Sequence, residues 1–284
     1  MRNPTDTSVQ GHLTLAFPMK SPADCAALRE KIPTLVSDLY RGADATGIVH
    51  YGRFIELNGT IYLLADYDGE LETVLAALAR HLGAVLDPLL AHVSAPPPTP
   101  VADNTAAFVK WAKDHCLKEM ADYVACPGAT VHKIKSLAAA AGITLEPYTG
   151  QQLALLPIMP MKGRLSVFAV QAVFALFYRY LKAGADGVGT VHFVHLVEFP
   201  GHLIGFFTVY DGPWDKYLQD FAEQLGPAFD ILFRFTKTAS PMPTSKHAGE
   251  FSKWVFDHEL KPLAFYAAYP GLQVQDVKAL LADG

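Results

Sequence analysis

Residues 47–69, GIVHYGRFIELNGTIYLLADYDG, occur again in similar form at 189–212, GTVHFVHLVEFPGHLIGFFTVYDG. Each copy has two apolar runs rich in β-branched and aromatic residues. In the first copy they are joined by Asn58-Gly59, a strong short signal for a β-hairpin. The match extends outward on both sides, from Phe17-Pro18-Met19-Lys20, which aligns with Met159-Pro160-Met161-Lys162, to Lys135, which aligns with Lys278. A match this long and regular means that the chain is a tandem duplication.

Around the hairpin, each copy has the pattern of a strand, a helix, the hairpin, a second helix and a last strand. In the first copy we predict strands at 12–18, 47–57, 60–67 and 86–93, and helices at 21–42 and 70–83. This β-α-β-β-α-β order is the ferredoxin-like split unit. Two added helices, 104–118 and 130–141, complete the copy. We therefore divide the chain into two ferredoxin-like repeats with added C-terminal helices, 1–150 and 151–284.

The hairpin strands are apolar on both faces, although the helices of a ferredoxin-like unit cover only one face of its sheet. The other face must therefore be buried as well. The predicted fold class is α+β, with the two tandem units packed sheet against sheet as a pseudo-dimer within one chain.

The composition excludes several function classes. With 23 Lys and Arg against 28 Asp and Glu, a net charge of -5 and no basic run, the chain lacks the cationic surface that nucleic-acid binding requires. Its three cysteines form no CxxC pair, which argues against a disulfide framework or a zinc ribbon. The first residues, MRNPTDTSVQGH, lack the apolar stretch of a secretory signal, so we expect a cytoplasmic protein.

Two fused ferredoxin-like units that meet through their sheets resemble the dimeric α+β barrel superfamily. Its members include dye-decolourising peroxidases, chlorite dismutases and antibiotic-biosynthesis monooxygenases. The fused members are often haem enzymes whose proximal histidine comes from the second copy. The GxxDG motif of the peroxidases is matched at 183–187, AGADG, except at its first glycine.

The resemblance implies a haem-dependent, peroxidase-like oxidoreductase that acts on a small apolar substrate. Two alternatives remain open at this point. One is a cofactor-independent monooxygenase or cyclase of the antibiotic-biosynthesis type, with a His or Tyr as the base. The other is a non-catalytic carrier of hydrophobic ligands.

Residues that differ between the copies are the candidate site residues, because one active site needs only one set of groups. His195 aligns with Arg53, Arg234 with Ala91, and His247 with Asn104. On a regular strand His192 and His195 point to opposite faces, and His195 shares its face with Phe193. A strand histidine in apolar surroundings is more often a hydrogen-bonded core residue than a ligand.

The resemblance assigns provisional roles to these residues. His247, or alternatively His195, would be the haem iron ligand, and Arg234 would contact a propionate or a distal group. His192 and His195 are the candidate catalytic histidines, and Phe193 and Phe207 complete the candidate cofactor-binding set. Tyr-Asp-Gly occurs in both copies, at 67–69 and 210–212, and is therefore predicted to be structural, with the Asp capping the helix that follows.

Residues 165–181, LSVFAVQAVFALFYRYL, form a predicted helix that is apolar on nearly every face, whereas the first copy has an ordinary amphipathic helix there. We expect this segment to join two copies in a homo-oligomer, since an interface is the commonest reason for a large apolar patch. The wall of an apolar pocket and docking on a membrane surface are the alternatives.

Overall fold

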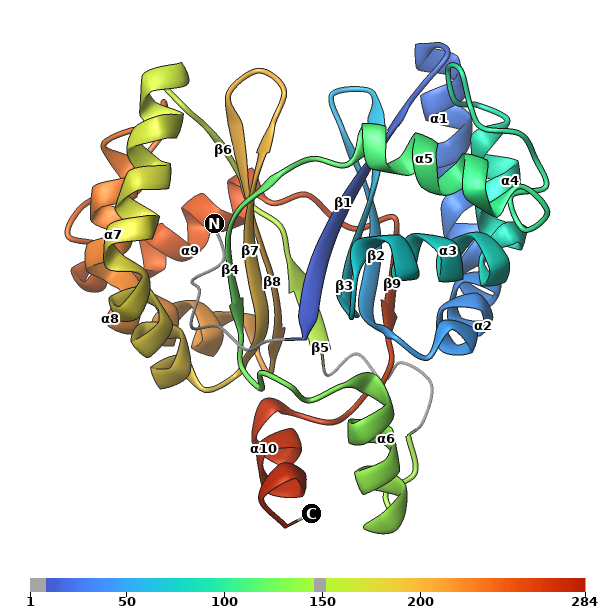
Figure 1. Cartoon of the computed structure of the whole chain (residues 1–284). Coiled ribbons are helices and arrows are strands. Elements are labelled where there is room, and N and C mark those ends of the chain that lie inside the picture. The colour runs from blue at the N-terminus through green and yellow to red at the C-terminus, as the bar shows by residue number, and fades with distance from the viewer. Residues whose placement is uncertain (1–8, 146–151, 284) are drawn as a thin grey trace.

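A computed structural model describes residues 9–145 and 152–283, and it confirms the predicted fold class. Two antiparallel sheets face each other, and helices cover their outer faces (Figure 1). The resemblance to the dimeric α+β barrel holds at the level of this architecture. The boundary predicted between the repeats at residue 150 lies outside the described residues.

The first repeat follows the predicted order up to its second helix. Its long first helix is broken at the 3-10 turn η1, which contains Pro33, and Asn58 and Gly59 both have positive φ, 52° and 75°, as the hairpin turn requires. The elements are β1 (Gln10–Pro18), α1 (Pro22–Lys31), η1 (Ile32–Leu35), α2 (Val36–Thr46), β2 (Val49–Leu57), β3 (Thr60–Asp68), α3 (Leu71–His81), α4 (Gly83–Leu90), α5 (Thr105–His115), β4 (Glu119–Val124) and α6 (Val131–Ala140).

The second repeat has the same order, with one long helix in place of α1, η1 and α2. Its elements are β5 (Gln152–Leu155), β6 (Ile158–Pro160), α7 (Arg164–Val188), β7 (Val191–Phe199), β8 (Leu203–Asp211), α8 (Trp214–Phe233), η2 (Thr244–Lys246), α9 (Ala248–His258), β9 (Ala264–Ala267) and α10 (Val274–Asp283). Among the described residues, α7 is the single helix that is by itself long and apolar enough to cross a membrane.

The predicted last strand of each unit is wrong. Residues 86–93 lie mostly in α4, and the aligned residues 229–236 begin within the last turns of α8, with Arg234 directly after its final residue. The apolar residues Leu82, Val85, Leu86 and Leu89 are spaced to bury one helix face, and a short apolar run of this kind does not distinguish a strand from a helix. Only isolated bridges, Met19 with Val93 and Met161 with Thr236, remain at this edge.

The two repeats exchange strands instead. β4 belongs to the first repeat but pairs with β7, while β9 belongs to the second repeat and pairs with β2. The sheet orders are therefore β1-β3-β2-β9 and β4-β7-β8-β5, with β6 also paired to β8. A tyrosine of each exchanged strand forms a hydrogen bond with a helix of the other repeat. Tyr123 of β4 donates to Asp186 of α7, and Tyr266 of β9 donates to Asp44 of α2, both at 2.8 Å.

Removing either of these hydroxyl groups is expected to loosen the exchange. Tyr123→Phe and Tyr266→Phe should each lower the free energy of unfolding by about 1 kcal/mol, the usual net value of such a hydrogen bond. Urea denaturation measures this, with Tyr180→Phe as the control, since its exposed hydroxyl reaches Gln224 O only at 3.5 Å. Equal stabilities for all three variants would contradict the prediction.

Candidate functional site

A pair of β-bulges, at His50 in β2 and at His192 in β7, corrects the prediction that His192 and His195 face opposite sides. The register of each strand shifts at the bulged residue, which breaks the alternation of side chains. The ring of His192 consequently lies 5.4 Å from the ring of Tyr51 in the opposite sheet. His192 and His195 both lie in the inter-sheet space.

His50 and His192 form the same hydrogen bond in the two repeats, each to the aspartate of a Tyr-Asp-Gly motif. His50 Nε2 lies 2.9 Å from Asp68 Oδ1, and His192 Nε2 lies 2.8 Å from Asp211 Oδ1. The second oxygen of each carboxylate accepts the N–H that opens a distant helix, Val131 of α6 and Val274 of α10. The aspartates of the Tyr-Asp-Gly motifs are thus structural caps, but of α6 and α10 rather than of the helices that follow them.

The aligned residues Arg53 and His195 meet each other between the two sheets. Arg53 Nη2 lies 3.1 Å from His195 Nε2, and both side chains are fully buried. A guanidinium can only donate, so His195 Nε2 accepts and the proton of its neutral ring resides on Nδ1. The ring of Phe207 packs 5.5 Å from that of His195, and the guanidinium carbon lies 6.0 Å from the Phe207 ring.

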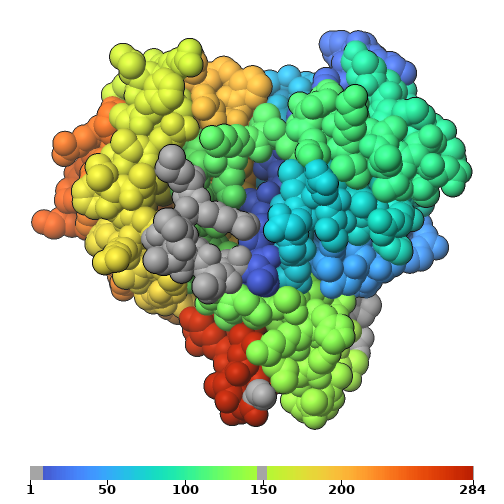
Figure 2. Space-filling model, viewed as in Figure 1, coloured from blue at the N-terminus to red at the C-terminus, as the bar shows by residue number. Residues whose placement is uncertain are grey.

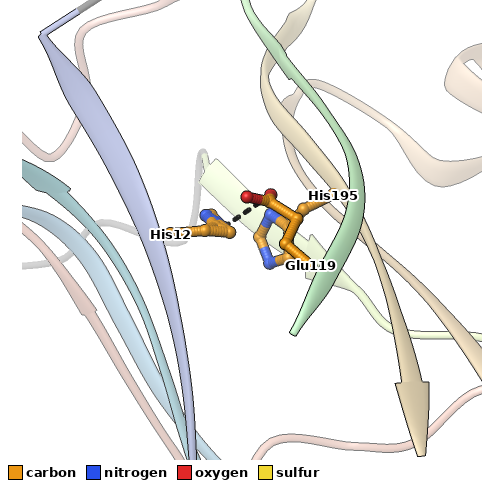
Figure 3. A group of neighbouring side chains, drawn as sticks. All are labelled: His12, Glu119 and His195. Atoms are coloured by element: carbon orange, nitrogen blue, oxygen red, sulfur yellow. Dashed lines mark ion pairs between the residues drawn. The ribbon is translucent and has the colours of Figure 1, made fainter. Parts of the chain in front are cut away.

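Asp66 lies at the centre of this cluster. His12 is directly opposite Asp66 in the β1–β3 ladder, and His12 Nδ1 lies 2.8 Å from Asp66 Oδ1. Asp66 Oδ1 is also 3.7 Å from His195 Nδ1, and Asp66 Oδ2 is 3.9 Å from Arg53 Nη1. His12 Nε2 faces the exchanged strand β4, where Glu119 Oε1 lies 3.5 Å away (Figure 3). We call these five residues (His12, Arg53, Asp66, Glu119 and His195) the inter-sheet cluster.

The inter-sheet cluster is not repeated by the duplication. His12 aligns with Ala154, Asp66 with Val209, and Glu119 with Pro262, while Arg53 and His195 align with each other. The fold alone therefore does not require these polar groups, since the same positions of the twin unit are mostly apolar. Buried ionisable groups that packing does not explain are candidates for function.

Burial sets the protonation states of the cluster. It raises the pKa of Asp66 from 3.8 to about 7, an effect that the nearby Arg53 charge only partly offsets. Burial also holds the pKa of His195 well below its usual range, and the positive charge of Arg53, as well as that of His12 whenever His12 is protonated, acts in the same direction. A carboxyl group that titrates near neutrality beside two imidazoles is suited to proton transfer.

The raised pKa of Asp66 predicts a pH-dependent stability. Between pH 3.8 and about 7 the folded protein holds a proton on Asp66 that the unfolded chain has lost, so this stabilisation is complete at low pH and disappears as the pH rises through about 7. The lowered pKa of His195 acts in the opposite direction below its unfolded value. Asp66→Asn removes the first effect directly, so urea denaturation at several pH values should show the wild type losing up to about 1.4 kcal/mol per pH unit relative to the variant.

The matched control for this measurement is Asp215→Asn at an exposed position, whose free energy of unfolding should depend on pH as that of the wild type does. A difference between the wild type and Asp66→Asn that is independent of pH would contradict the assignment.

Three members of the cluster form a possible metal-ligand set. His12, Glu119 and His195 offer ligand atoms that lie within 4.8 Å of one another, and Asp66 behind His12 has the position of an outer-shell carboxylate. Arg53 opposes this use, because it already donates to His195 Nε2 and would place a second positive charge against the ion. The protonation pattern fits proton exchange better than metal ligation.

The other residues predicted from the sequence lie in two places. Phe193 and Phe207 are buried between the sheets with His192 and His195. Arg234 is exposed at the end of α8, and His247 is half-buried at the start of α9 in the outer layer, with its Nδ1 3.4 Å from Glu250 Oε1. The proposed set of His247, Arg234 and His195 is therefore not brought together.

An apolar hollow lies under the middle of α7. The buried residues of this helix are near its ends, Val167 and Val170 on one side and Gly184, Ala185 and Val188 on the other, and none lies within 171–183. A cavity of about 50 Å³ lies between Phe174 and the outer face of the second sheet, and a groove of about 340 Å³ between α7 and α8 shares Phe174 and Leu181 with it.

Among the described residues, haem fits neither in the hollow under α7 nor beside His195. The lining of the hollow contains tyrosines but no histidine. The ring of His195 is enclosed by Phe207, by His12 and by the Arg53 guanidinium, which leaves no face for a porphyrin.

Comparison with known proteins yields distant structural neighbours only. No protein-family model and no curated protein matches the chain. A candidate monooxygenase from Fusobacterium nucleatum is 12% identical, with 94% of this chain and 97% of that chain covered and a TM-score of 0.39. A second one, from Lactobacillus acidophilus, is 9% identical, with 93% and 99% covered and a TM-score of 0.31. Chlorite dismutase from Candidatus Nitrospira defluvii is 14% identical, with 86% and 96% covered and a TM-score of 0.26. These TM-scores are too low to bear on the function of this chain.

Proposed function

We propose that this protein is an enzyme that removes a proton from a small apolar substrate at the inter-sheet cluster, without a prosthetic group. The observation that carries the proposal is the buried His12–Asp66 pair, which stands where the twin unit has Ala154 and Val209. When dioxygen oxidises the deprotonated substrate, the reaction is that of a cofactor-independent monooxygenase, one of the alternatives left open by the sequence.

His12 is the proposed general base. Asp66 accepts from Nδ1 and so holds the imidazole in the tautomer whose Nε2 carries a lone pair. That nitrogen faces Glu119, whose side chain is 26% exposed and is therefore the member of the cluster nearest to solvent. We infer that the substrate enters past β4 and displaces the Glu119 carboxylate from His12.

Arg53 is the proposed stabiliser of the negative charge that develops on the substrate. Its Nε and Nη1 are buried and have no hydrogen-bond partner among the described residues, so two donors are available to an oxyanion. Donors that are fixed in place in a dry site stabilise such charge more strongly than water does. The neighbouring side chains Leu64 and Phe207 are buried and apolar, which favours an apolar substrate body.

In the monooxygenase form, the substrate carbanion transfers its electrons to dioxygen, the oxidant. One oxygen atom forms the new C=O group at the carbon that has lost two hydrogens, and the other oxygen leaves as water. The protein's part is to take the first proton on His12 and to return it to the departing oxygen.

Dioxygen uptake with anthrone, a tricyclic ketone that carries an acidic CH₂ group, tests this proposal. Protein freed of metals and haem should increase uptake above the buffer rate, and EDTA should leave that increase unchanged. Hemin added to the same protein should give no cyanide-sensitive Soret band. A ligated Soret band that is lost in His195→Ala or His247→Ala would overturn the proposal in favour of a haem enzyme.

A second candidate function is transport of an apolar molecule, and the hollow under α7 favours it. The groove between α7 and α8, about 340 Å³, lies within the range of small-ligand pockets. Mass spectrometry of an organic extract of the purified protein separates the two functions: a carrier releases a stoichiometric apolar molecule, whereas the proposed enzyme releases none.

A further inference from the structure

The outer face of α7 is an uncovered apolar stripe. Leu165, Phe168 and Leu176 have exposed fractions of 85%, 51% and 81%, and Phe177 and Tyr180 beside them are 46% and 43% exposed. Leu165, Phe168, Ala172 and Leu176 recur at helical spacing and so lie on one side of the helix. In Figure 2 this helix (yellow) forms an outer edge of the molecule.

The duplicate unit shows that the fold does not need these side chains. Leu165 aligns with Ala23, Phe168 with Ala26, and Leu176 with Thr34, in a helix that is broken at η1 and carries charges of both signs. Small or polar residues thus suffice at the same places on the same scaffold. The fold therefore does not account for the large apolar groups of α7.

Positive charges lie at the N-terminal end of the stripe and within it. Arg164 is the first residue of α7, with Lys162, Arg234 and Lys237 close to this end, where Lys162 Nζ donates to Arg234 O at 2.6 Å. Arg179 follows Leu176 by three residues and so lies on the same side of the helix as the stripe. None of these five forms an ion pair with a carboxylate in the part of the chain that the structure describes. Four of them align with uncharged residues of the twin unit, and Lys162 alone aligns with a lysine. These basic residues in a chain of net charge -5 indicate an anionic partner.

Charge distinguishes a lipid surface from a second copy. Taking about 200 Å² for a fully exposed side chain of this size, the five apolar residues present about 600 Å², which is enough for either partner. Two copies of α7 packed against each other would, however, bring their basic residues together, whereas an anionic lipid surface would neutralise them. The exposed side of α7 has leucine and phenylalanine, with basic residues at its N-terminal end and at Arg179, and this combination is typical of an interfacial membrane helix.

We propose that α7 docks the protein on a membrane surface that contains anionic lipid. The helix lies in the plane of the membrane and does not cross it, because its two ends are buried against the second sheet and α8. A Cβ atom at Gly184, for example, would overlap the side chain of Leu225. Leu165, Phe168 and Leu176 enter the boundary of the acyl chains, and the basic residues meet the lipid phosphates.

Flotation of the full chain with lipid vesicles tests the proposal. The protein should float with vesicles of phosphatidylcholine and phosphatidylglycerol and remain behind with phosphatidylcholine alone. Leu165→Ser/Leu176→Ser should reduce the bound fraction by about tenfold or more, and Arg164→Gln/Arg234→Gln should reduce it similarly. The matched control is Ala23→Ser/Thr34→Ser on the twin helix, which should bind as the wild type does. Circular dichroism establishes that all variants are folded.

Two results would overturn the proposal. One is equal flotation of the wild type and Leu165→Ser/Leu176→Ser. The other is absence of flotation together with a wild-type dimer that this double variant turns into a monomer, which would assign the stripe to contact between copies, as the apolar segment 165–181 predicts.

Discussion

His12→Ala is expected to slow dioxygen-dependent turnover of anthrone by about 10²–10⁴-fold, the usual contribution of a positioned general base. The reason is that the three fully buried polar groups of the inter-sheet cluster cannot substitute for it, and the substrate is proposed to displace the fourth, Glu119, from the site. Arg53 has no lone pair, burial holds the pKa of His195 well below its usual range, and Asp66 lies behind His12 in the β1–β3 ladder. Because the substituted side chain is small and apolar, and Ala154 is natural at the aligned position, the variant should fold.

Three further variants make this result specific. His132→Ala, at an exposed position of α6, is the matched control and should retain full activity. Asp66→Asn should lower the rate less than His12→Ala and should change the pH profile, because it removes the carboxyl group whose pKa lies at about 7. His247→Ala should have no effect. Full activity in His12→Ala, or loss of activity in His247→Ala, would contradict the assignment of the base.

Arg53→Met is expected to lower the free energy of unfolding by about 3–5 kcal/mol near pH 8, because it leaves the Asp66 carboxylate buried without its nearest positive charge. Arg53→Met/Asp66→Val should recover most of this loss and could be more stable than the wild type, since buried charge pairs replaced by apolar residues of similar volume often gain stability. Valine is the residue that the twin unit has at the aligned position, Val209. Both variants should be inactive.

Urea denaturation of the wild type, Arg53→Met, Asp66→Val and the double variant forms a double-mutant cycle. The cycle measures the coupling free energy between Arg53 and Asp66. Asp38→Asn/Arg41→Gln, which removes an ion pair on the surface of α2, is the control and should show almost no coupling. Additive effects of Arg53→Met and Asp66→Val would mean that the two side chains do not stabilise each other. A double variant that keeps its activity would separate the inter-sheet cluster from catalysis.

Part of the candidate site was accessible from the sequence. The alignment of the two copies identified His195 as an asymmetric residue, and alternation placed Phe193 on its face. The same alignment also shows that His12, Asp66 and Glu119 differ between the copies, because they align with Ala154, Val209 and Pro262. The prediction of His247 and Arg234 rests instead on the resemblance to haem proteins, in which the proximal histidine comes from the second copy.

The inter-sheet cluster could not have been assembled from strand patterns alone. His12 and Asp66 become neighbours through the β1–β3 register, and Glu119 reaches them only because β4 leaves its own repeat to pair with β7. The β-bulge at His192 changed the face of a residue that regular alternation had placed on the opposite side. Register, bulges and strand exchange depend on partners far away in the sequence, which local periodicity does not encode.

Hydrophobic periodicity and turn chemistry within short segments are enough to predict the duplication, the hairpins with the Asn58-Gly59 turn, the fold class and the burial of both sheets. They are not enough to predict that residues 86–93 are helical, that the repeats exchange β4 and β9, or that Arg53 contacts its own duplicate His195. The free energy of a buried polar cluster depends on which groups packing brings within a few ångströms of one another. That arrangement is set by the whole chain at once.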